Sequence, residues 1–204
     1  MLKLVLASES PRRIELLKQI GIDFDIIPAN IDESPKEFAE AGKYAMEMSR
    51  RKALSVAEDI RTKVSGGTLV LGADTIVAVD GLILGKPADS ADAEHMLKLL
   101  ENKWHEVITG ITLVQTSNLE IISDMEVTRV KFSAYPEGFL ARYIASGEPF
   151  DKAGGYGIQG LGSLMVERIE GCYFNVMGLP LFRLSRILER QGHEVLSWMK
   201  ALDI

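Results

Sequence analysis

Residues 68–85, TLVLGADTIVAVDGLILG, form the stretch that most constrains the fold, because they are almost entirely apolar and contain Asp80-Gly81. Two apolar runs joined by Asp-Gly predict a strand, a type I′ turn and a returning strand. Asp74 lies in the middle of the first run, where a buried carboxylate is costly unless another group pairs with it or uses it. We therefore expect the rest of the chain to supply a partner or a ligand for Asp74.

The remaining pattern predicts an α/β or α+β fold with one long mixed sheet and flanking helices. Further strands are expected at residues 3–8, 22–27, 105–116, 119–133 and 163–171, and helices at residues 10–21, 36–66, 90–100, 136–147 and 180–191. Ser90 is the expected N-cap of the third helix. Strands and helices alternate in the first half, whereas strands predominate later. No repeat or linker interrupts the chain, so a single bilobed domain over residues 1–204 is the expectation.

Composition narrows the classes of function. The 204 residues carry a formal charge of −6, which argues against a general nucleic-acid-binding surface but not against a small anionic ligand. No apolar run is long enough for a membrane helix, and the first ten residues are too short an apolar segment for a signal peptide. A single cysteine, Cys172, favours a structural thiol in a reducing cytoplasm.

Two basic motifs could bind an anion. In SESPRR, Ser10 and Pro11 predict a helix start that carries Arg12 and Arg13 in its first turn, where backbone N–H groups favour anions. A plain surface helix with two solvated arginines explains this motif equally well. In SRRKA, which contains Lys52, a solvated basic helix face is the favoured interpretation.

The acidic strand and its hairpin form a third motif. The predicted turn should return Lys86, within GKP, close to Asp74, and Gly72 would allow a ligand to approach the backbone. An aspartate beside a loop lysine suits a general base or a metal ligand next to a phosphate contact. The alternative is an internal Asp–Lys pair.

A glycine-rich stretch, GEPFDKAGGYGIQG, provides a fourth motif with polar side chains at Glu148, Asp151, Lys152 and Gln159. Its glycines suit close backbone approach to a polar ligand, and the alternative is a long surface loop. The three histidines lack the spacing of metal ligands, so structural roles are favoured for them. The available hard ligands are carboxylates, which suit Mg²⁺ or Mn²⁺.

Taken together and in this order, these motifs resemble the Maf family of nucleoside triphosphate pyrophosphatases. The matching segments are LASESPRR, SRRKA, GADTIV, GKP, HEVITG, DKAGGYGIQG and NVMGLPL. The resemblance implies a long mixed sheet with a deep cleft between two lobes, and a homodimer. It also implies a hydrolase that uses a divalent metal to cleave a nucleoside triphosphate into a monophosphate and pyrophosphate.

The resemblance also assigns roles to individual residues. It places the general base at Asp74 and phosphate-handling cations at Arg13, Lys52 and Lys86. Ser8 and Glu33 match positions of the same cleft, and Lys152 would add a further cation. The candidate metal carboxylates, which the sequence does not rank, are Glu33, Glu148 and Asp151.

Three further positions match those that select the base. Arg12, Thr75 and Gln159 resemble the branch of the family that acts on dTTP and UTP, with modified pyrimidine nucleotides as possible house-cleaning substrates. An amide such as Gln159 can both donate to and accept from a pyrimidine edge. The competing hypotheses are a non-catalytic nucleotide-binding regulator of septum formation and cell division, and a phosphatase that releases inorganic phosphate.

Overall fold

The computed structural model describes residues 3–32, 40–64 and 67–194. The chain forms two compact units. The first unit comprises Met1–Asp74, Thr109–Glu126 and Gly178–Ile204, and the second comprises Thr75–Ile108 and Val127–Met177. The single bilobed domain and its cleft stay predictions.

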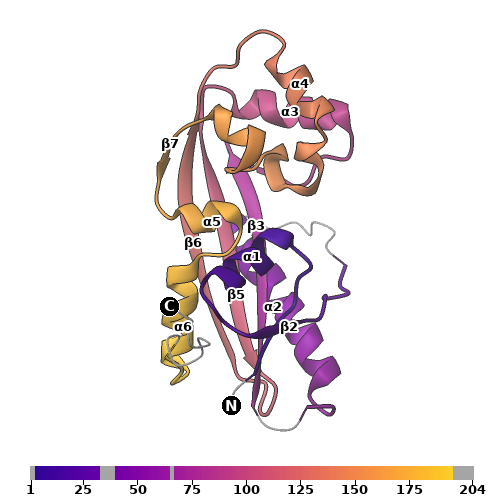
Figure 1. Cartoon of the computed structure of the whole chain (residues 1–204), viewed down its shortest axis with the longest axis vertical. Coiled ribbons are helices and arrows are strands. Elements are labelled where there is room, and N and C mark those ends of the chain that lie inside the picture. The colour runs from indigo at the N-terminus through magenta and orange to yellow at the C-terminus, as the bar shows by residue number, and fades with distance from the viewer. Residues whose placement is uncertain (1–2, 33–39, 65–66, 195–204) are drawn as a thin grey trace. The chain divides into compact units, whose positions relative to one another are not determined.

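A seven-stranded sheet organises the molecule, with the strand order β2-β1-β3-β5-β6-β7 and β4 paired with β3 (Figure 1). The strands are β1 (Lys3–Leu6), β2 (Phe24–Ile26), β3 (Thr68–Val79), β4 (Leu82–Leu84), β5 (Trp104–Gln115), β6 (Ile121–Phe132) and β7 (Val166–Glu170). β1 is parallel to both β2 and β3, whereas β4 is antiparallel to β3 and β7 is antiparallel to β6. The predicted mixed sheet with flanking helices is therefore confirmed.

The first unit contains the helices α1 (Pro11–Gln19), α2 (Ala41–Ile60) and α6 (Leu181–Arg190). One core cluster of this unit joins the apolar side of α2 to β1 and β3; its buried members are Val5, Ala7, Ala53, Val56, Ala57, Ile60, Val70 and Val114. α6 lies alongside β6, where Arg183 Nε donates to Glu126 Oε2 at 2.7 Å (Figure 1). The helices expected at residues 10–21 and 180–191 thus form, and each buries one side.

The second unit contains α3 (Ser90–Leu100), α4 (Phe139–Ala145) and α5 (Tyr173–Met177). Three short 3₁₀ helices fill the glycine-rich stretch: η1 (Glu148–Asp151), η2 (Ala153–Gly155) and η3 (Gly160–Met165). The core of this unit combines α3 with the strands and with an aromatic group; the aromatic members are Phe132, Tyr143 and Tyr156.

Of the two local predictions, the hairpin turn is confirmed and the helix cap is wrong. The hairpin turn is confirmed, because Asp80 and Gly81 both have positive φ, at 50° and 79°, as a type I′ turn requires. The predicted N-cap at Ser90 is wrong by one residue: Asp89 caps α3, and its side chain accepts a hydrogen bond from Asp92 N. Among the described residues no helix is long and apolar enough to cross a membrane.

Candidate functional site

Arg13 is held in a fixed position at the start of α1. Its Nε donates to Gly178 O at 2.8 Å, and its Nη1 donates to Ser8 Oγ at 3.1 Å. The side chain is only 8% exposed, whereas Arg12 is half-buried. Because two acceptors orient the Arg13 guanidinium and charged groups are seldom buried, this arginine differs from the solvated one that a plain surface helix would carry.

Ser8 and Asp74 follow matched positions of two parallel strands. Leu6 of β1 pairs with Leu71 of β3, and Ala7 N donates to Leu71 O at 2.8 Å. Ser8 therefore leaves the sheet beside the part of β3 that leads to Asp74. This register accounts for the presence of SESPRR and of Gly72–Asp74 in the same part of the first unit.

Asp74 has a buried partner. Lys52 Nζ donates to Asp74 Oδ1 at 2.7 Å, and the two residues are 8% and 9% exposed. Two opposite charges at this distance offset part of the penalty for burying each of them. The expected solvated position of Lys52 is therefore wrong, although Arg50 of the same motif does form a half-exposed pair with Glu47.

The close approach of α2 to the sheet places Lys52 over Asp74. A Cβ atom at Gly72 would lie 2.2 Å from Ser49 O, and one at Gly110 would lie 2.4 Å from Ala45 O. The expectation that Gly72 leaves room for a ligand is wrong, because the backbone of α2 fills that space. These two glycines let the helix backbone sit almost directly on the strands.

Thr75 and Lys86 belong to the hairpin of the second unit. β4 pairs with β3 in the register Val77↔Leu84, and extending this register past the end of β4 sets Lys86 opposite Thr75. Lys86 is exposed, and Thr75 is partly buried. The predicted return of the GKP loop thus agrees with the pairing, whereas its proximity to Asp74 in the other unit stays a prediction.

The glycine-rich stretch packs on this hairpin. Gly154 N donates to Gly85 O at 2.9 Å, and a Cβ atom at Gly154 would lie 2.9 Å from a methyl group of Val77. With φ at 69°, Gly154 also has a left-handed backbone that favours glycine. The stretch is therefore an ordered part of the second unit, and its glycines serve its packing on β3.

The polar side chains of this stretch have different surroundings. Lys152 Nζ donates to Asp151 Oδ1 and to Glu148 O, each at 2.6 Å. Gln159 is exposed and directly precedes η3. Lys152 and Gln159 thus lie in one segment of the second unit with Lys86 nearby through the Gly154–Gly85 hydrogen bond.

The three carboxylates predicted to hold a metal do not form a cluster in the part of the chain that the structure describes. Glu33 lies outside the described residues. Both Glu148 oxygens accept backbone N–H groups, and Asp151 pairs with Lys152. No group of three or more His, Cys, Asp or Glu side chains that could hold a metal occurs within residues 3–32, 40–64 and 67–194.

His105 is part of the core of the second unit, as the sequence pattern favours. Its Nε2 lies 2.6 Å from Tyr156 Oη, and its ring packs edge-on against Phe132. Burial lowers the pKa of His105 to about 3, so the imidazole is neutral near pH 7. Burial raises the pKa of Tyr156, which keeps its hydroxyl protonated.

Sequence reasoning gave no role to two residues of NVMGLPL. Gly178, with φ at 109°, presents the carbonyl that orients Arg13. Asn175 is fully buried, and its Nδ2 donates to Val107 O at 2.9 Å and to Thr128 Oγ1 at 3.0 Å. The only signal in the sequence was the run of asparagine, glycine and proline itself, because the partners of both residues are distant along the chain.

Known proteins that resemble this chain include a protein family, curated relatives and a solved structure. The family model described as Maf-like protein matches residues 3–191. A dTTP/UTP pyrophosphatase of Acetivibrio thermocellus is 49% identical over 96% of this chain and 98% of its own length. A dTTP/UTP pyrophosphatase of Thermosipho africanus is 49% identical over 94% of each chain. Among solved structures, the Staphylococcus aureus Ham1 protein gives a TM-score of 0.42 at 17% identity, over 78% of this chain and 77% of its own.

Proposed function

Because this chain belongs to the Maf-like protein family, we propose that it is a nucleotide diphosphatase that hydrolyses dTTP and UTP to the monophosphate and pyrophosphate. Two curated relatives that are 49% identical carry the name dTTP/UTP pyrophosphatase and align over at least 94% of the chain. The names of the relatives support the substrate. The observation that carries the chemistry is the buried Lys52–Asp74 pair, with 2.7 Å between Nζ and Oδ1.

Asp74 is the proposed general base. A water oxygen attacks the α-phosphorus, a proton of that water passes to the Asp74 carboxylate, and the bond from the α-phosphorus to the bridging oxygen breaks. The bonding electrons leave with pyrophosphate. Lys52 keeps the carboxylate oriented through one oxygen, so the other oxygen is available to a water molecule.

The proposed phosphate contacts are Arg13, Lys52, Lys86 and Lys152. Arg13 enters the reaction already oriented by Ser8 and Gly178, which supports a role for it in positioning phosphate oxygens. The cations offset charge that develops on the leaving pyrophosphate, and such preorganised charge supplies much of the rate in phosphoryl-type transfers.

Base selection is proposed for Arg12, Thr75 and Gln159. Gln159 is exposed at the start of η3, so its amide can face a pyrimidine edge. A site of this kind discriminates strongly, because the wrong base leaves buried polar groups without partners. Modified pyrimidine nucleotides fall within the same substrate class.

A divalent metal, Mg²⁺ or Mn²⁺, is the proposed cofactor. Mg²⁺ is commonly bound by one or two carboxylates together with substrate phosphates, so the lack of a carboxylate cluster within the described residues is compatible with it. Glu33 and Asp151 stay the proposed ligands, whereas Glu148 fits less well because both of its oxygens accept backbone N–H groups. When bound, the metal would supply charge neutralisation at the phosphates.

The remaining proposals are a homodimer, a cytoplasmic location and no membrane or nucleic-acid-polymer partner. A non-catalytic regulator is the less favoured alternative, since the relatives above are named as enzymes. It predicts nucleotide binding without release of pyrophosphate. A phosphatase predicts release of inorganic phosphate instead.

The first test measures pyrophosphate and phosphate release from a panel of nucleoside triphosphates with Mg²⁺. We expect pyrophosphate from dTTP and UTP, and a loss of at least about a hundredfold in kcat for Asp74→Asn, with nucleotide binding retained. Asp80→Asn is the matched control, because Asp80 is an exposed acid of the same hairpin and asparagine tolerates its positive φ. Near-normal turnover in Asp74→Asn would remove Asp74 from the role of base, and no turnover of any nucleotide would favour the regulator.

A further inference from the structure

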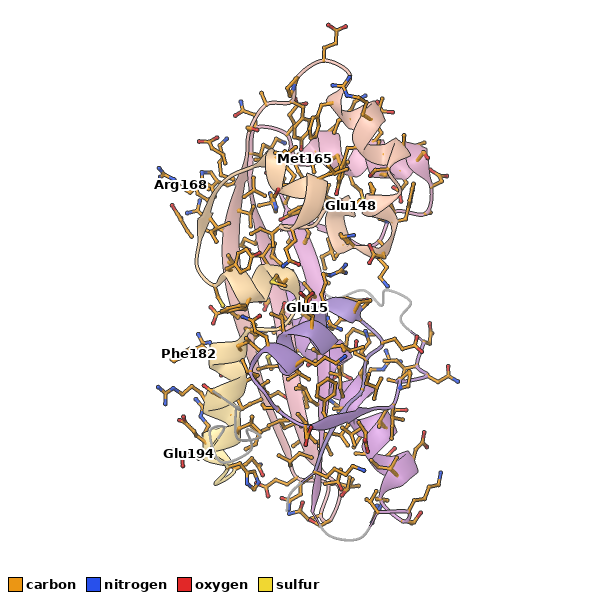
Figure 2. All side chains as sticks on the ribbon, in the orientation of Figure 1. Glu15, Glu148, Met165, Arg168, Phe182 and Glu194 are labelled. Carbon is orange, nitrogen blue, oxygen red and sulfur yellow. The ribbon has the colours of Figure 1, made fainter. Side chains whose placement is uncertain are left out.

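Glu148 accepts three hydrogen bonds through its carboxylate. Oε2 accepts from Leu161 N at 2.9 Å, and Oε1 accepts from Gly162 N at 2.9 Å and from Tyr143 Oη at 3.2 Å. Figure 2 shows Glu148 among the turns of the second unit. A carboxylate that receives separate backbone donors on each oxygen is a strong and directional brace.

The two backbone donors, Leu161 N and Gly162 N, lie in the first turn of η3, which begins at Gly160 directly after Gln159. A helical turn leaves its first N–H groups without partners inside the turn, and a carboxylate stabilises them more than a neutral group does. Glu148 thus caps η3 from a different segment of the chain. Gln159 lies immediately before the capped residues.

The contact between Glu148 and η3 is tight. A Cβ atom at Gly160 would lie 2.8 Å from Glu148 Oε2, and Gly160 has φ at 69°. A Cβ atom at Gly162 would lie 2.4 Å from Gly157 O. Glycine at position 160 suits the left-handed φ beside the carboxylate, and glycine at position 162 avoids a clash with the Gly157 backbone, so a larger residue at either position would displace the segment next to Gln159.

Glu148 is itself held from the other side. Tyr143, which is buried, donates its hydroxyl to Oε1, and Lys152 Nζ donates to the Glu148 backbone oxygen at 2.6 Å. Burial and the neighbouring Glu148 carboxylate raise the pKa of Tyr143, so its hydroxyl remains a donor at every pH of interest. The brace therefore links α4, η1 and η3 into one assembly that carries both Lys152 and Gln159.

We propose that Glu148 is a positioning residue that sets base selectivity by fixing the backbone next to Gln159, and that it is not a metal ligand. This inference rests on the proposed function, because Gln159 selects a base only if the substrate is a nucleotide. It assigns the two glutamate oxygens to Leu161 and Gly162, which also explains why a carboxylate lies so close to the glycines of this segment.

The test compares Glu148→Gln with the wild type for dTTP and for dGTP. Glutamine keeps the size but turns one acceptor into a donor, which then faces a backbone N–H. We expect the ratio of kcat/KM for dTTP over dGTP to fall by about tenfold, the effect of one unsatisfied N–H next to the selecting residue. Tyr143→Phe removes the hydroxyl that donates to Oε1 and that also has a backbone hydrogen bond with Gly157. It should lower the same ratio by a smaller factor, because Leu161 N and Gly162 N keep their acceptors.

Glu101→Gln is the matched control, because Glu101 Oε1 accepts from Tyr135 N at 2.8 Å, a carboxylate-to-backbone bond in the same unit whose donor belongs to neither η3 nor the residues beside Gln159. It should leave the selectivity ratio unchanged. An equal loss of kcat for every nucleotide in Glu148→Gln, with selectivity unchanged, would overturn the proposal. If Glu148 were a metal ligand, Glu148→Gln would raise the Mg²⁺ concentration needed for half-maximal rate. That result would overturn the proposal as well.

A second readout does not depend on activity. Amide hydrogen exchange at Leu161 and Gly162 should be slow in the wild type and at least about tenfold faster in Glu148→Gln. Unchanged exchange rates would show that the Glu148 carboxylate does not stabilise the first turn of η3. If the wild type releases no pyrophosphate, the proposed function fails, whereas the exchange result still decides whether Glu148 holds η3.

Discussion

At the scale of single residues, His105 shows how the second unit keeps a titratable group neutral. Its ring lies between Phe132 and Tyr156, with ring centroids 4.8 Å and 5.3 Å away. Its Nδ1 has no hydrogen-bond partner among the described residues. An imidazolium in this position would carry a buried charge with an N–H that no acceptor satisfies, so protonation opposes folding.

We therefore predict that His105 makes the free energy of unfolding decrease as the pH falls. The pKa is about 3 in the folded protein and 6.5 in the unfolded chain, so below pH 6.5 the unfolded state binds the extra proton. The contribution is complete above pH 6.5 and is lost as the pH falls toward 3, by about 1.4 kcal/mol per pH unit. Urea titrations between pH 7 and pH 4.5 give the free energy of unfolding at each pH. This free energy should depend less steeply on pH in His105→Asn than in the wild type. The control His95→Gln, at an exposed position, should leave the pH dependence unchanged.

The Asp74 pair shows what could be predicted at this scale. The apolar run around Asp74 predicted that this carboxylate needs a partner, and the structure supplies one. The partner is Lys52 of α2, whereas the hairpin pattern suggested Lys86. Hairpin register is local and is encoded by Asp80-Gly81, but the packing of α2 on β3 depends on residues far apart in the sequence, so no short pattern contains it.

At the scale of elements, the packing of α2 on the sheet depends on Gly72 and Gly110. Their missing side chains let the α2 backbone approach β3 and β5 at positions where a Cβ atom would meet Ser49 O or Ala45 O. Ser49 Oγ also lies 2.8 Å from Thr112 Oγ1, a buried hydrogen bond between the helix and β5. A shift of α2 would therefore disturb this bond and the Lys52–Asp74 pair together.

We predict that Gly72→Ala lowers the free energy of unfolding by more than about 3 kcal/mol, because the new methyl group meets backbone atoms that cannot rotate away. Activity should fall with it, since the displaced helix carries Lys52. Gly85→Ala is the control, because a Cβ atom there meets nothing within 4 Å, and its stability should change by less than about 1 kcal/mol. Denaturant unfolding measures the free energy of unfolding of both variants. A Gly72→Ala protein as stable as the wild type would show that α2 can move away from the strand.

The regular helices and the hairpin could be predicted from the sequence, whereas the short 3₁₀ helices could not. α1 begins at the predicted Ser10-Pro11 start, and the hairpin turns at Asp80-Gly81. The ends of both, and of α6, fall within a few residues of the expected ones. The glycine-rich stretch at residues 147–160 had a long surface loop as its alternative, and a strand was expected from residue 163. Instead, three 3₁₀ helices occupy Glu148–Met165, and β7 begins at Val166. The conformation of Glu148–Met165 depends on Glu148 and on left-handed glycines, whose partners a linear pattern does not identify.

At the scale of the whole molecule, the order of the strands in the sheet could not be predicted from the sequence. β1 lies between β2 and β3 and is parallel to both, which requires crossovers through α1 and α2. Composition and alternation predicted a mixed sheet, but pairing partners are chosen by contacts between distant segments. The candidate residues fall in both units, with Arg13, Lys52 and Asp74 in the first and Lys86, Lys152 and Gln159 in the second.

Net charge leads to the last prediction, which separates a mononucleotide from a polymer as ligand. The formal charge of −6 repels a polyanion, whose non-specific binding needs a broad basic surface, whereas a mononucleotide needs only a few oriented cations such as Arg13. A non-hydrolysable dTTP analogue at about 100 times its Kd should raise the Tm by about 5–10 °C. An oligothymidylate at the same thymine concentration and about 150 mM salt should leave the Tm unchanged. An equal shift with the oligomer would mean that the basic residues form a nucleic-acid surface, and no shift with either ligand would count against nucleotide binding itself.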